Sequence, residues 1–336
     1  MEAYVVKFLI SLLLIALVTS KITAENQLHK EYKSGEDHHE HSTAKNSTYK
    51  HGNKDGIEVR AVVPPSCYTQ FFVGSLPPVG LRNNLKNIEY ICQEVNQQTY
   101  YGTMFDEGIG IAVFSAYTLT QANVNFQPGR PQASWRKTPG IAKEGSNAIY
   151  LNQPFDKGHL VPAKTYSSTL DSFRSTFFYS NAVPQRPTFN RGQWFQFENR
   201  IRVYAQQCTQ GPQPGALYLI TGTAFGHITN GGQGMTPVQV SQLGPAGKNP
   251  AIDIPNSMWT AGCCVQPNGI ESFAVIGNNV PVQTNILMQQ IPVARLQGIL
   301  AADVVNLNIG GPNVDLFPGN PACSNINSDL GNLPSG

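Results

Sequence analysis

The residues best suited to hydrolytic chemistry lie between positions 155 and 202. His159 follows Gly158 and is one of two histidines, with His227, in the part of the chain that we expect to fold. A neutral imidazole can take a proton from water near pH 7, which suits a general base. Gly158 allows the backbone to turn closely beside it, and Asp156 could orient the strand or the imidazole ring. Taken alone, however, a histidine after a glycine is more often structural.

A second group of polar residues lies on a helix that we expect over residues 190–207. Asn190, at its start, offers a neutral oxygen to the hard cation that phosphodiester hydrolysis needs. Glu198 and Arg202 sit at roughly 80° and 120° around the helix from Asn190, at the border of its apolar stripe. Each also has a commoner structural explanation, Asn190 as a helix cap and the other two as a surface ion pair. Their ordered combination with His159 favours a site.

The distribution of charge indicates a polyanionic partner. Charged residues make up 13% of the 336 residues, about half the usual fraction in soluble proteins. Residues 130–202 nevertheless contain eleven Lys/Arg against four Asp/Glu, whereas residues 203–336 contain two against five. A basic central region suits binding of nucleic acid, although an ordinary solvated surface is an equally good explanation of the charge alone.

The first residues are typical of an exported protein. Lys7 precedes the apolar run 8–18, and small residues follow, so residues 1–24 are predicted to be a signal peptide and the protein to be secreted. Residues 25–61 form a polar, histidine-rich segment that we expect to be disordered; it holds five of the seven histidines and a glycosylation sequon at Asn46. The folded domain is expected over residues 62–325, with a C-terminal tail over residues 326–336.

Six cysteines in an oxidising compartment predict up to three disulfides. They are Cys67, Cys92, Cys208, Cys263, Cys264 and Cys323. Spacing alone does not choose among the fifteen possible pairings. We expect the adjacent Cys263 and Cys264 to bond to different partners, and a local bridge between Cys67 and Cys92.

Short apolar runs between Gly/Pro turns predict an α+β domain with a mixed sheet at its core. Besides the helix over residues 190–207, a second helix is expected after Pro292, over residues 293–300. The expected strands cover residues 109–119, 175–183, 216–224, 257–265 and 272–277.

The motifs together resemble one enzyme family. Asp156-Lys-Gly-His159 and Ser180-Asn-Ala-Val-Pro-Gln185, followed by Asn190 and Glu198 in this order and spacing, are similar to the signature of the DNA/RNA non-specific endonucleases. Residues 219–223 resemble a later strand of that family. The extended N-terminus and the even cysteine number look like its secreted animal branch. The resemblance implies a ββα-metal (His-Me finger) active site.

The resemblance also implies a role for each residue. His159 activates the attacking water, Asn190 is the single protein ligand of Mg²⁺ (or Mn²⁺ in its place), and Glu198 hydrogen-bonds the waters of the ion. Asn181 helps to fix the site, and Arg202 neutralises phosphate charge. The implied products of DNA and RNA cleavage carry 5′-phosphate ends.

One position departs from the family pattern, and the assignment of another family residue stays open. Lys157 stands where the family has arginine, so a phosphate contact there keeps its charge but loses the bidentate fork. Arg130 and Arg136 both compete for the role of an upstream phosphate-binding residue, with Arg130 favoured. A catalytically silent, secreted binder of nucleic acid or another polyanion is the alternative function, and a phosphodiesterase for small nucleotides is a third.

Overall fold

The computed structural model describes residues 64–82, 85–125, 131–229, 234–244, 251–282, 287–306 and 313–325, with Ser328 and Leu330. The chain divides into two units, residues 1–47 and 48–336, and every described residue belongs to the second. The predicted signal peptide and polar segment, including the Asn46 sequon, lie outside the described residues. Arg130 does so too.

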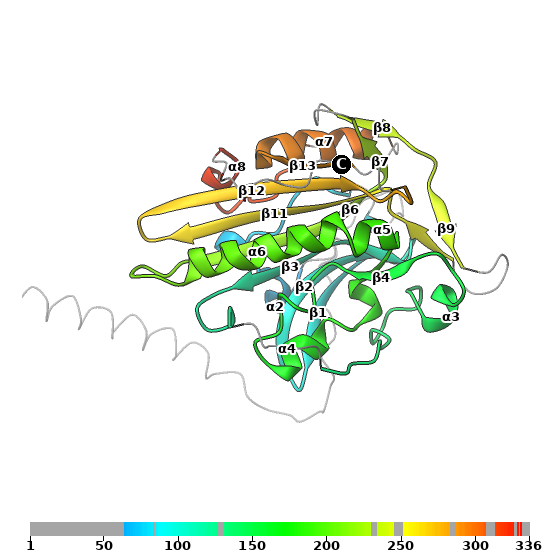
Figure 1. Cartoon of the computed structure of the whole chain (residues 1–336), viewed down its shortest axis with the longest axis horizontal. Helices are drawn as coiled ribbons and strands as arrows, with labels where there is room; N and C mark the ends of the chain where they lie inside the picture. The colour runs from blue at the N-terminus through cyan, green and yellow to red at the C-terminus, as the bar shows by residue number, and fades with distance from the viewer. Residues whose placement is uncertain are drawn as a thin grey trace, which may run out of the picture. The chain divides into compact units, whose positions relative to one another are not determined.

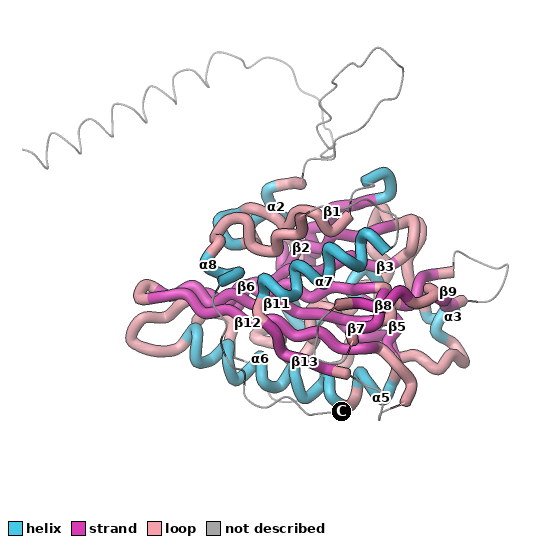
Figure 2. The backbone as a smooth tube through the Cα atoms, turned by 90° about the horizontal axis from the view of Figure 1, so that it is seen from above, coloured by secondary structure: helices cyan, strands magenta, loops and turns pink. Residues whose placement is uncertain are grey.

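A seven-stranded sheet forms the centre of the described unit (Figure 1), and its strands run side by side in Figure 2. In spatial order the strands are β1 (Ile88–Val95), β2 (Gln98–Asp106), β3 (Ile111–Leu119), β6 (Ala216–Ala224), β11 (Ser257–Gln266), β12 (Gly269–Asn278) and β13 (Met288–Ile291). Every neighbouring pair is antiparallel. The α+β class is therefore confirmed, but the sheet is antiparallel rather than mixed.

Three two-stranded ribbons and several helices complete the described fold. The ribbons are β4 (Asp156–His159) with β5 (Ala182–Gln185), β7 (Gly226–Ile228) with β8 (Met235–Pro237), and β9 (Ser241–Leu243) with β10 (Ile252–Ile254). The α-helices are α2 (Ser66–Thr69), α3 (Asn147–Tyr150), α4 (Leu170–Ser175), α5 (Pro187–Asn190), α6 (Gln193–Thr209), α7 (Val293–Asn306) and α8 (Ala322–Asn325). The 3₁₀ turns are η1 (Val73–Ser75), η2 (Leu85–Asn87) and η3 (Tyr179–Asn181).

The central sheet separates two hydrophobic cores because successive side chains of a strand point to opposite faces. On β12, Phe273 packs into one core and the adjacent Ala274 into the other. Helix α6 buries Trp194 and Phe197 in the first core and packs against β6 and β11 (Figure 1). Helix α7 buries Leu296 and its neighbours in the second core. The two long helices thus cover opposite faces of the sheet, and no described helix is long and apolar enough to cross a membrane.

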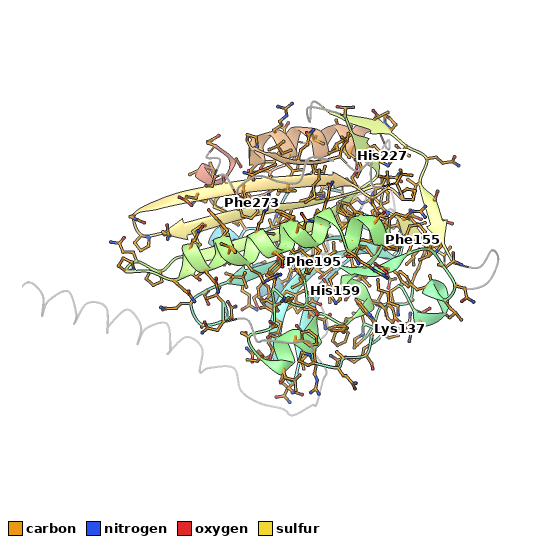
Figure 3. All side chains as sticks on the ribbon, viewed as in Figure 1. Lys137, Phe155, His159, Phe195, His227 and Phe273 are labelled. Carbon is orange, nitrogen blue, oxygen red and sulfur yellow. A yellow bond between two sulfur atoms is a disulfide. The ribbon has the colours of Figure 1, made fainter. Side chains whose placement is uncertain are left out.

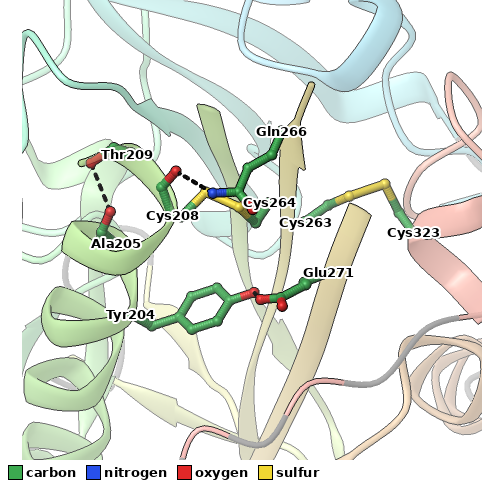
Figure 4. Close-up of a disulfide and its surroundings, with 9 residues drawn as sticks. All are labelled: Tyr204, Ala205, Cys208, Thr209, Cys263, Cys264, Gln266, Glu271 and Cys323. Atoms are coloured by element: carbon green, nitrogen blue, oxygen red, sulfur yellow. Dashed lines mark hydrogen bonds between the residues drawn. A yellow bond between two sulfur atoms is a disulfide. The ribbon is translucent and has the colours of Figure 1, made fainter. Parts of the chain in front are cut away.

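The same alternation explains the disulfides (Figure 4). Cys264 faces the first core and bonds to Cys208 at the end of α6, whereas Cys263 faces the second core and bonds to Cys323 on α8. Cys67 on α2 bonds to Cys92 on β1. The predicted Cys67–Cys92 bridge and the different partners of the adjacent cysteines are both confirmed.

The structure corrects two of the predicted elements. Residues 175–183 do not form one strand: they contain the end of α4, the turn η3 and the start of β5. The helix expected over residues 190–207 is two helices, and Asn190 is the last residue of the short α5 rather than the first of α6. Gly192 separates them, and a Cβ there would lie 2.3 Å from the carbonyl oxygen of Thr188. The chain therefore changes direction at a position that only glycine fits.

The other predicted elements are found close to their expected bounds. Strands β3, β6, β11 and β12 cover the expected residues 109–119, 216–224, 257–265 and 272–277 to within three residues at either end. Helix α7 begins at Val293 as expected and extends to Asn306, beyond the predicted end.

Candidate active site

The ribbon of β4 and β5 presents His159 at the end of β4, opposite Ala182. Gly158, one residue before, lies under the buried side chain of Gln185, and a Cβ at this position would fall 2.1 Å from Gln185 Oε1. The sequence suggested that this glycine allows a close turn of the backbone, but it has a different role. It allows the Gln185 side chain to pack directly against the strand that carries the histidine.

Asn181 fixes the backbone immediately after His159. Its Oδ1 accepts a hydrogen bond from the Val161 amide at 2.9 Å, and its Nδ2 donates to the carbonyl oxygens of Val161 and Thr176 at 3.1 and 3.0 Å. The residue is fully buried and does not line the pocket described next. Its position suits a role in shaping the loop that follows β4.

A pocket of about 630 Å³ brings together residues from β4, α4, α5 and α6. It is lined by Lys157, His159, Pro162, Ala163, Lys164, Phe173, Asn190, Arg191, Phe195 and Glu198. The predicted residues His159, Lys157, Asn190 and Glu198 therefore meet in one place. The other histidine of the described chain, His227 on β7, lies apart from it (Figure 3).

Aromatic rings hold the imidazole of His159 on the wall of this pocket. The ring centroids of Trp135 and Phe177 lie 4.7 and 4.9 Å from that of His159, with Phe177 edge-on. Phe173 packs on Phe177 in turn, at 5.0 Å. These contacts limit rotation of the imidazole, so its orientation toward the pocket is set by packing. Nothing in the spacing of Trp135 and Phe177 predicted that they would contact the histidine.

Asp156 organises the residue expected to bind the metal. Its Oδ2 accepts a hydrogen bond from Asn190 Nδ2 at 2.9 Å and another from Arg191 Nε at 2.8 Å. Arg191 also donates from Nη2 to Asp156 Oδ1, completing a two-pronged ion pair. Both oxygens of Asp156 are thus bonded to Asn190 and Arg191. The Asp156–Arg191 pair was not predicted, because the two residues are distant in sequence.

Glu198 on α6 is partly exposed at the pocket, but its carboxyl group is surrounded by protein. Burial raises the pKa of Glu198 to about 8, although the nearby Arg202 and the indole N–H of Trp194 act in the opposite direction. Within the described residues, Arg202 donates only to the backbone oxygen of Glu198, at 3.4 Å, and does not line the pocket. The two side chains are therefore coupled through space rather than joined in a close ion pair.

Lys157 is held among polar and aromatic partners. Its Nζ donates to Asn147 Oδ1 at 2.6 Å and lies 5.8–6.0 Å from the ring centroids of Tyr150, Tyr179 and Trp135. Burial lowers the pKa of the Lys157 ammonium group. Contacts with aromatic faces stabilise its cationic form. The Lys157 ammonium group thus lies at the edge of the pocket and already contacts Asn147 and the aromatic rings.

The donor set suits a cation that keeps most of its own water. Among the described residues there is no group of three His, Cys, Asp or Glu side chains able to hold a metal ion. The amide nitrogen of Asn190 is directed to Asp156, which leaves its oxygen as the remaining polar atom of the carboxamide at the pocket. A single amide oxygen near the carboxyl group of Glu198 fits Mg²⁺, which dehydrates reluctantly.

The fold and the site together define a class of protein: an antiparallel α+β domain in which a short ribbon and the following helices bring a histidine, an asparagine and a glutamate to one pocket. A sequence profile described as DNA/RNA non-specific endonuclease matches residues 82–303, about two thirds of the chain. The chain belongs to the DNA/RNA non-specific endonuclease family.

Individual relatives are distant. Mitochondrial nuclease EXOG of Danio rerio is 30% identical over 94 residues, which cover 27% of this chain and 26% of that protein. Human mitochondrial endonuclease G is 32% identical over 80 residues, 24% of this chain and 25% of that protein. The matches thus span about a quarter of the length of these relatives. A crystal structure of an EndoG/EndoGI complex has the same fold, with a TM-score of 0.54, 17% identity, and coverage of 71% of this chain and 91% of that one.

Proposed function

We propose that the protein is a secreted, metal-dependent endonuclease that hydrolyses phosphodiester bonds of DNA and RNA with little sequence preference. The observation that carries the proposal is the meeting of His159, Asn190 and Glu198 in one pocket, although they come from a strand and two different helices. A protein that only binds nucleic acid needs cations for the phosphates, but it has no need of these three groups side by side.

In this proposal His159 is the catalytic residue that takes a proton from the attacking water. Asn190 would hold a divalent cation, which stabilises the negative charge that develops on the phosphate and the leaving oxygen. Glu198 accepts hydrogen bonds from water near the cation. Arg202, next to Glu198, contributes positive charge. Asn181 acts as a positioning residue for the loop after His159, and Lys157 contributes charge at the pocket edge.

Little sequence preference follows from the kind of contacts that the site offers. Lys157 and Lys164 line the pocket with positive charge, and contacts with phosphate carry no sequence information. Binding driven by phosphate contacts weakens steeply with salt, because condensed counterions are released on binding. Cleavage of both DNA and RNA, leaving 5′-phosphate ends, is part of the same proposal.

The decisive experiment compares wild-type protein, His159→Ala and the matched control His227→Ala on plasmid DNA and on RNA, with Mg²⁺ and with EDTA. His227 lies outside the pocket, so its replacement removes an imidazole without touching the site. We expect Mg²⁺-dependent cleavage by the wild type and the control and its loss in His159→Ala. Product ends are 5′-phosphates if they accept label from polynucleotide kinase only after phosphatase treatment.

Absence of metal-dependent cleavage by the wild type, with binding of oligonucleotides retained, would instead support the silent binder of polyanions. Cleavage that persists in His159→Ala would overturn the assignment of the base but not of the enzyme class.

Secretion is tested separately, by expressing the full chain in animal cells. We expect the protein in the medium, with an N-terminus close to residue 25 and a mobility that changes on removal of N-linked glycans. Retention of an uncleaved chain inside the cells would contradict secretion while leaving the nuclease proposal intact.

A further inference from the structure

A second, larger pocket lies beside the candidate active site. It measures about 1000 Å³ and is lined by residues 131–136 together with Arg174 and Phe177. None of these residues lines the first pocket. The proposed chemistry of His159, Asn190 and Glu198 therefore assigns no role to it.

One layer of aromatic side chains separates the two pockets. Trp135 and Phe177 line the second pocket and contact the ring of His159, which lines the first. Phe177 also packs on Phe173, a residue of the first pocket. A polymer bound at His159 can therefore reach the second pocket by passing over a single layer of rings.

The second pocket presents two cations that no acidic side chain in the described part of the chain neutralises. Arg136 and Arg174 are both exposed, and among the described residues neither has a carboxylate oxygen within 4.0 Å. Arg136 is held in place, since its Nη2 donates to the backbone oxygen of Arg174 at 3.0 Å and its guanidinium lies 4.3 Å from the ring centroid of Phe178. Two like charges beside one cavity favour an anionic occupant.

We propose that this pocket is a nucleotide subsite, in which Arg136 and Arg174 bind a phosphate of the nucleic-acid strand that flanks the bond cleaved at His159, while Trp135 and Phe177 contact its base or sugar. The inference rests on the proposed nuclease function. It deepens that function by giving the enzyme a longer footprint on the substrate. A guanidinium fork matches a phosphate in geometry and charge, and aromatic rings beside a cationic groove are a common arrangement for single-stranded nucleic acid.

The test uses Arg174→Gln, because Arg174 is exposed and its side chain forms no hydrogen bond or ion pair within the described part of the chain. Two substrates are compared: a single-stranded oligonucleotide of about twelve nucleotides, within the usual site sizes for single strands, and bis(4-nitrophenyl) phosphate, which has no flanking nucleotide. We expect KM for the oligonucleotide to rise about tenfold, the size of one charge-assisted hydrogen bond, with little change in kcat. Hydrolysis of the small diester should be unchanged.

Arg295→Gln on α7 is the matched control, since it removes the same charge from the opposite face of the sheet and should leave both substrates unaffected. If Arg174→Gln lost the same fraction of kcat/KM on both substrates, or lost none on either, the subsite would be overturned.

Binding is measured independently by fluorescence anisotropy of the labelled oligonucleotide in EDTA. We expect Arg174→Gln to weaken binding and to reduce the dependence of log Kd on log salt by about 0.7. This measurement needs no cleavage, so it separates the two proposals. An inactive wild type would refute the nuclease, whereas a weaker salt dependence of Kd in Arg174→Gln would still support the subsite. An unchanged slope would refute the subsite in an active enzyme.

Discussion

Asp156 accepts a hydrogen bond from the side-chain amide of Asn190, with 2.9 Å between Asn190 Nδ2 and Asp156 Oδ2. This contact fixes which end of the carboxamide faces the pocket, because the nitrogen is turned to the carboxylate and the oxygen to the other side. Arg191 donates to both oxygens of the same carboxylate and so fixes its position beside Asn190. The first residue of the histidine motif thus orients Asn190, the residue that we propose as the metal ligand.

Replacing Asp156 should therefore weaken cation binding more than it affects the fold. Asp156→Ala frees the Asn190 amide to rotate, and loss of such an orienting contact typically costs about ten- to a hundredfold in metal affinity. The Mg²⁺ concentration that gives half-maximal cleavage should rise accordingly, and calorimetric titration of Mg²⁺ should show the same shift. Arg191→Gln keeps the Asp156–Asn190 contact and should have a smaller effect. Equal effects of the two variants would show that Asp156 acts through Arg191 instead.

Gly158→Ala should destabilise the ribbon that carries His159. The added methyl group would meet the Gln185 side chain, and overpacking of this kind costs about 1–3 kcal/mol. Thermal unfolding measures the loss, and Gln185→Ala in the same chain should restore part of it by making room. Gly298→Ala is the control, since nothing lies within 4 Å of its Cβ position and alanine is favoured inside a helix. Similar melting of Gly158→Ala and wild type would argue against the close packing.

The raised pKa of Glu198 makes stability depend on pH in a predictable direction. Without metal, the folded protein keeps the Glu198 proton up to about pH 8, whereas the unfolded chain releases it near the ordinary value of 4.5. The unfolded state therefore binds fewer protons between these values, and the free energy of unfolding falls as the pH rises, by at most about 1.4 kcal/mol per pH unit.

Denaturant unfolding in EDTA at several pH values tests this expectation. Glu198→Gln should be less dependent on pH than the wild type over this range, and the exposed Glu94→Gln should behave as the wild type does. Parallel pH profiles of wild type and Glu198→Gln would contradict the raised pKa.

The Cys208–Cys264 disulfide should support both stability and the site. It joins the end of α6, the helix that carries Glu198, to β11, and it closes a loop with a sequence separation of 56. Chain entropy predicts a loss of about 4 kcal/mol when both cysteines become alanine. The Cys67–Cys92 pair, with a separation of 25, should cost slightly less and leave the kinetics unchanged. The comparison needs unfolding curves and cleavage rates of both double variants. Equal losses of cleavage rate in the two would argue that the Cys208–Cys264 disulfide has no specific effect on the site through α6.

The sequence by itself determined the local elements and the chemistry that they could perform. The strands over residues 216–224 and 257–265 were predicted because apolar runs between turns are a local signal, and His159, Asn190 and Glu198 were identified by type, order and spacing. The separate partners of Cys263 and Cys264 also followed locally, since adjacent residues on a strand face opposite sides.

Only the tertiary structure decided how these residues meet. The break between α5 and α6 depends on the approach of Gly192 to the Thr188 carbonyl, and the role of Gly158 depends on Gln185, a partner on another strand. Likewise, the contact of Trp135 with His159 and the Asp156–Asn190 hydrogen bond join positions more than twenty residues apart. Residue types and periodicity report what each segment can do, whereas such contacts arise only when segments distant in the chain pack together.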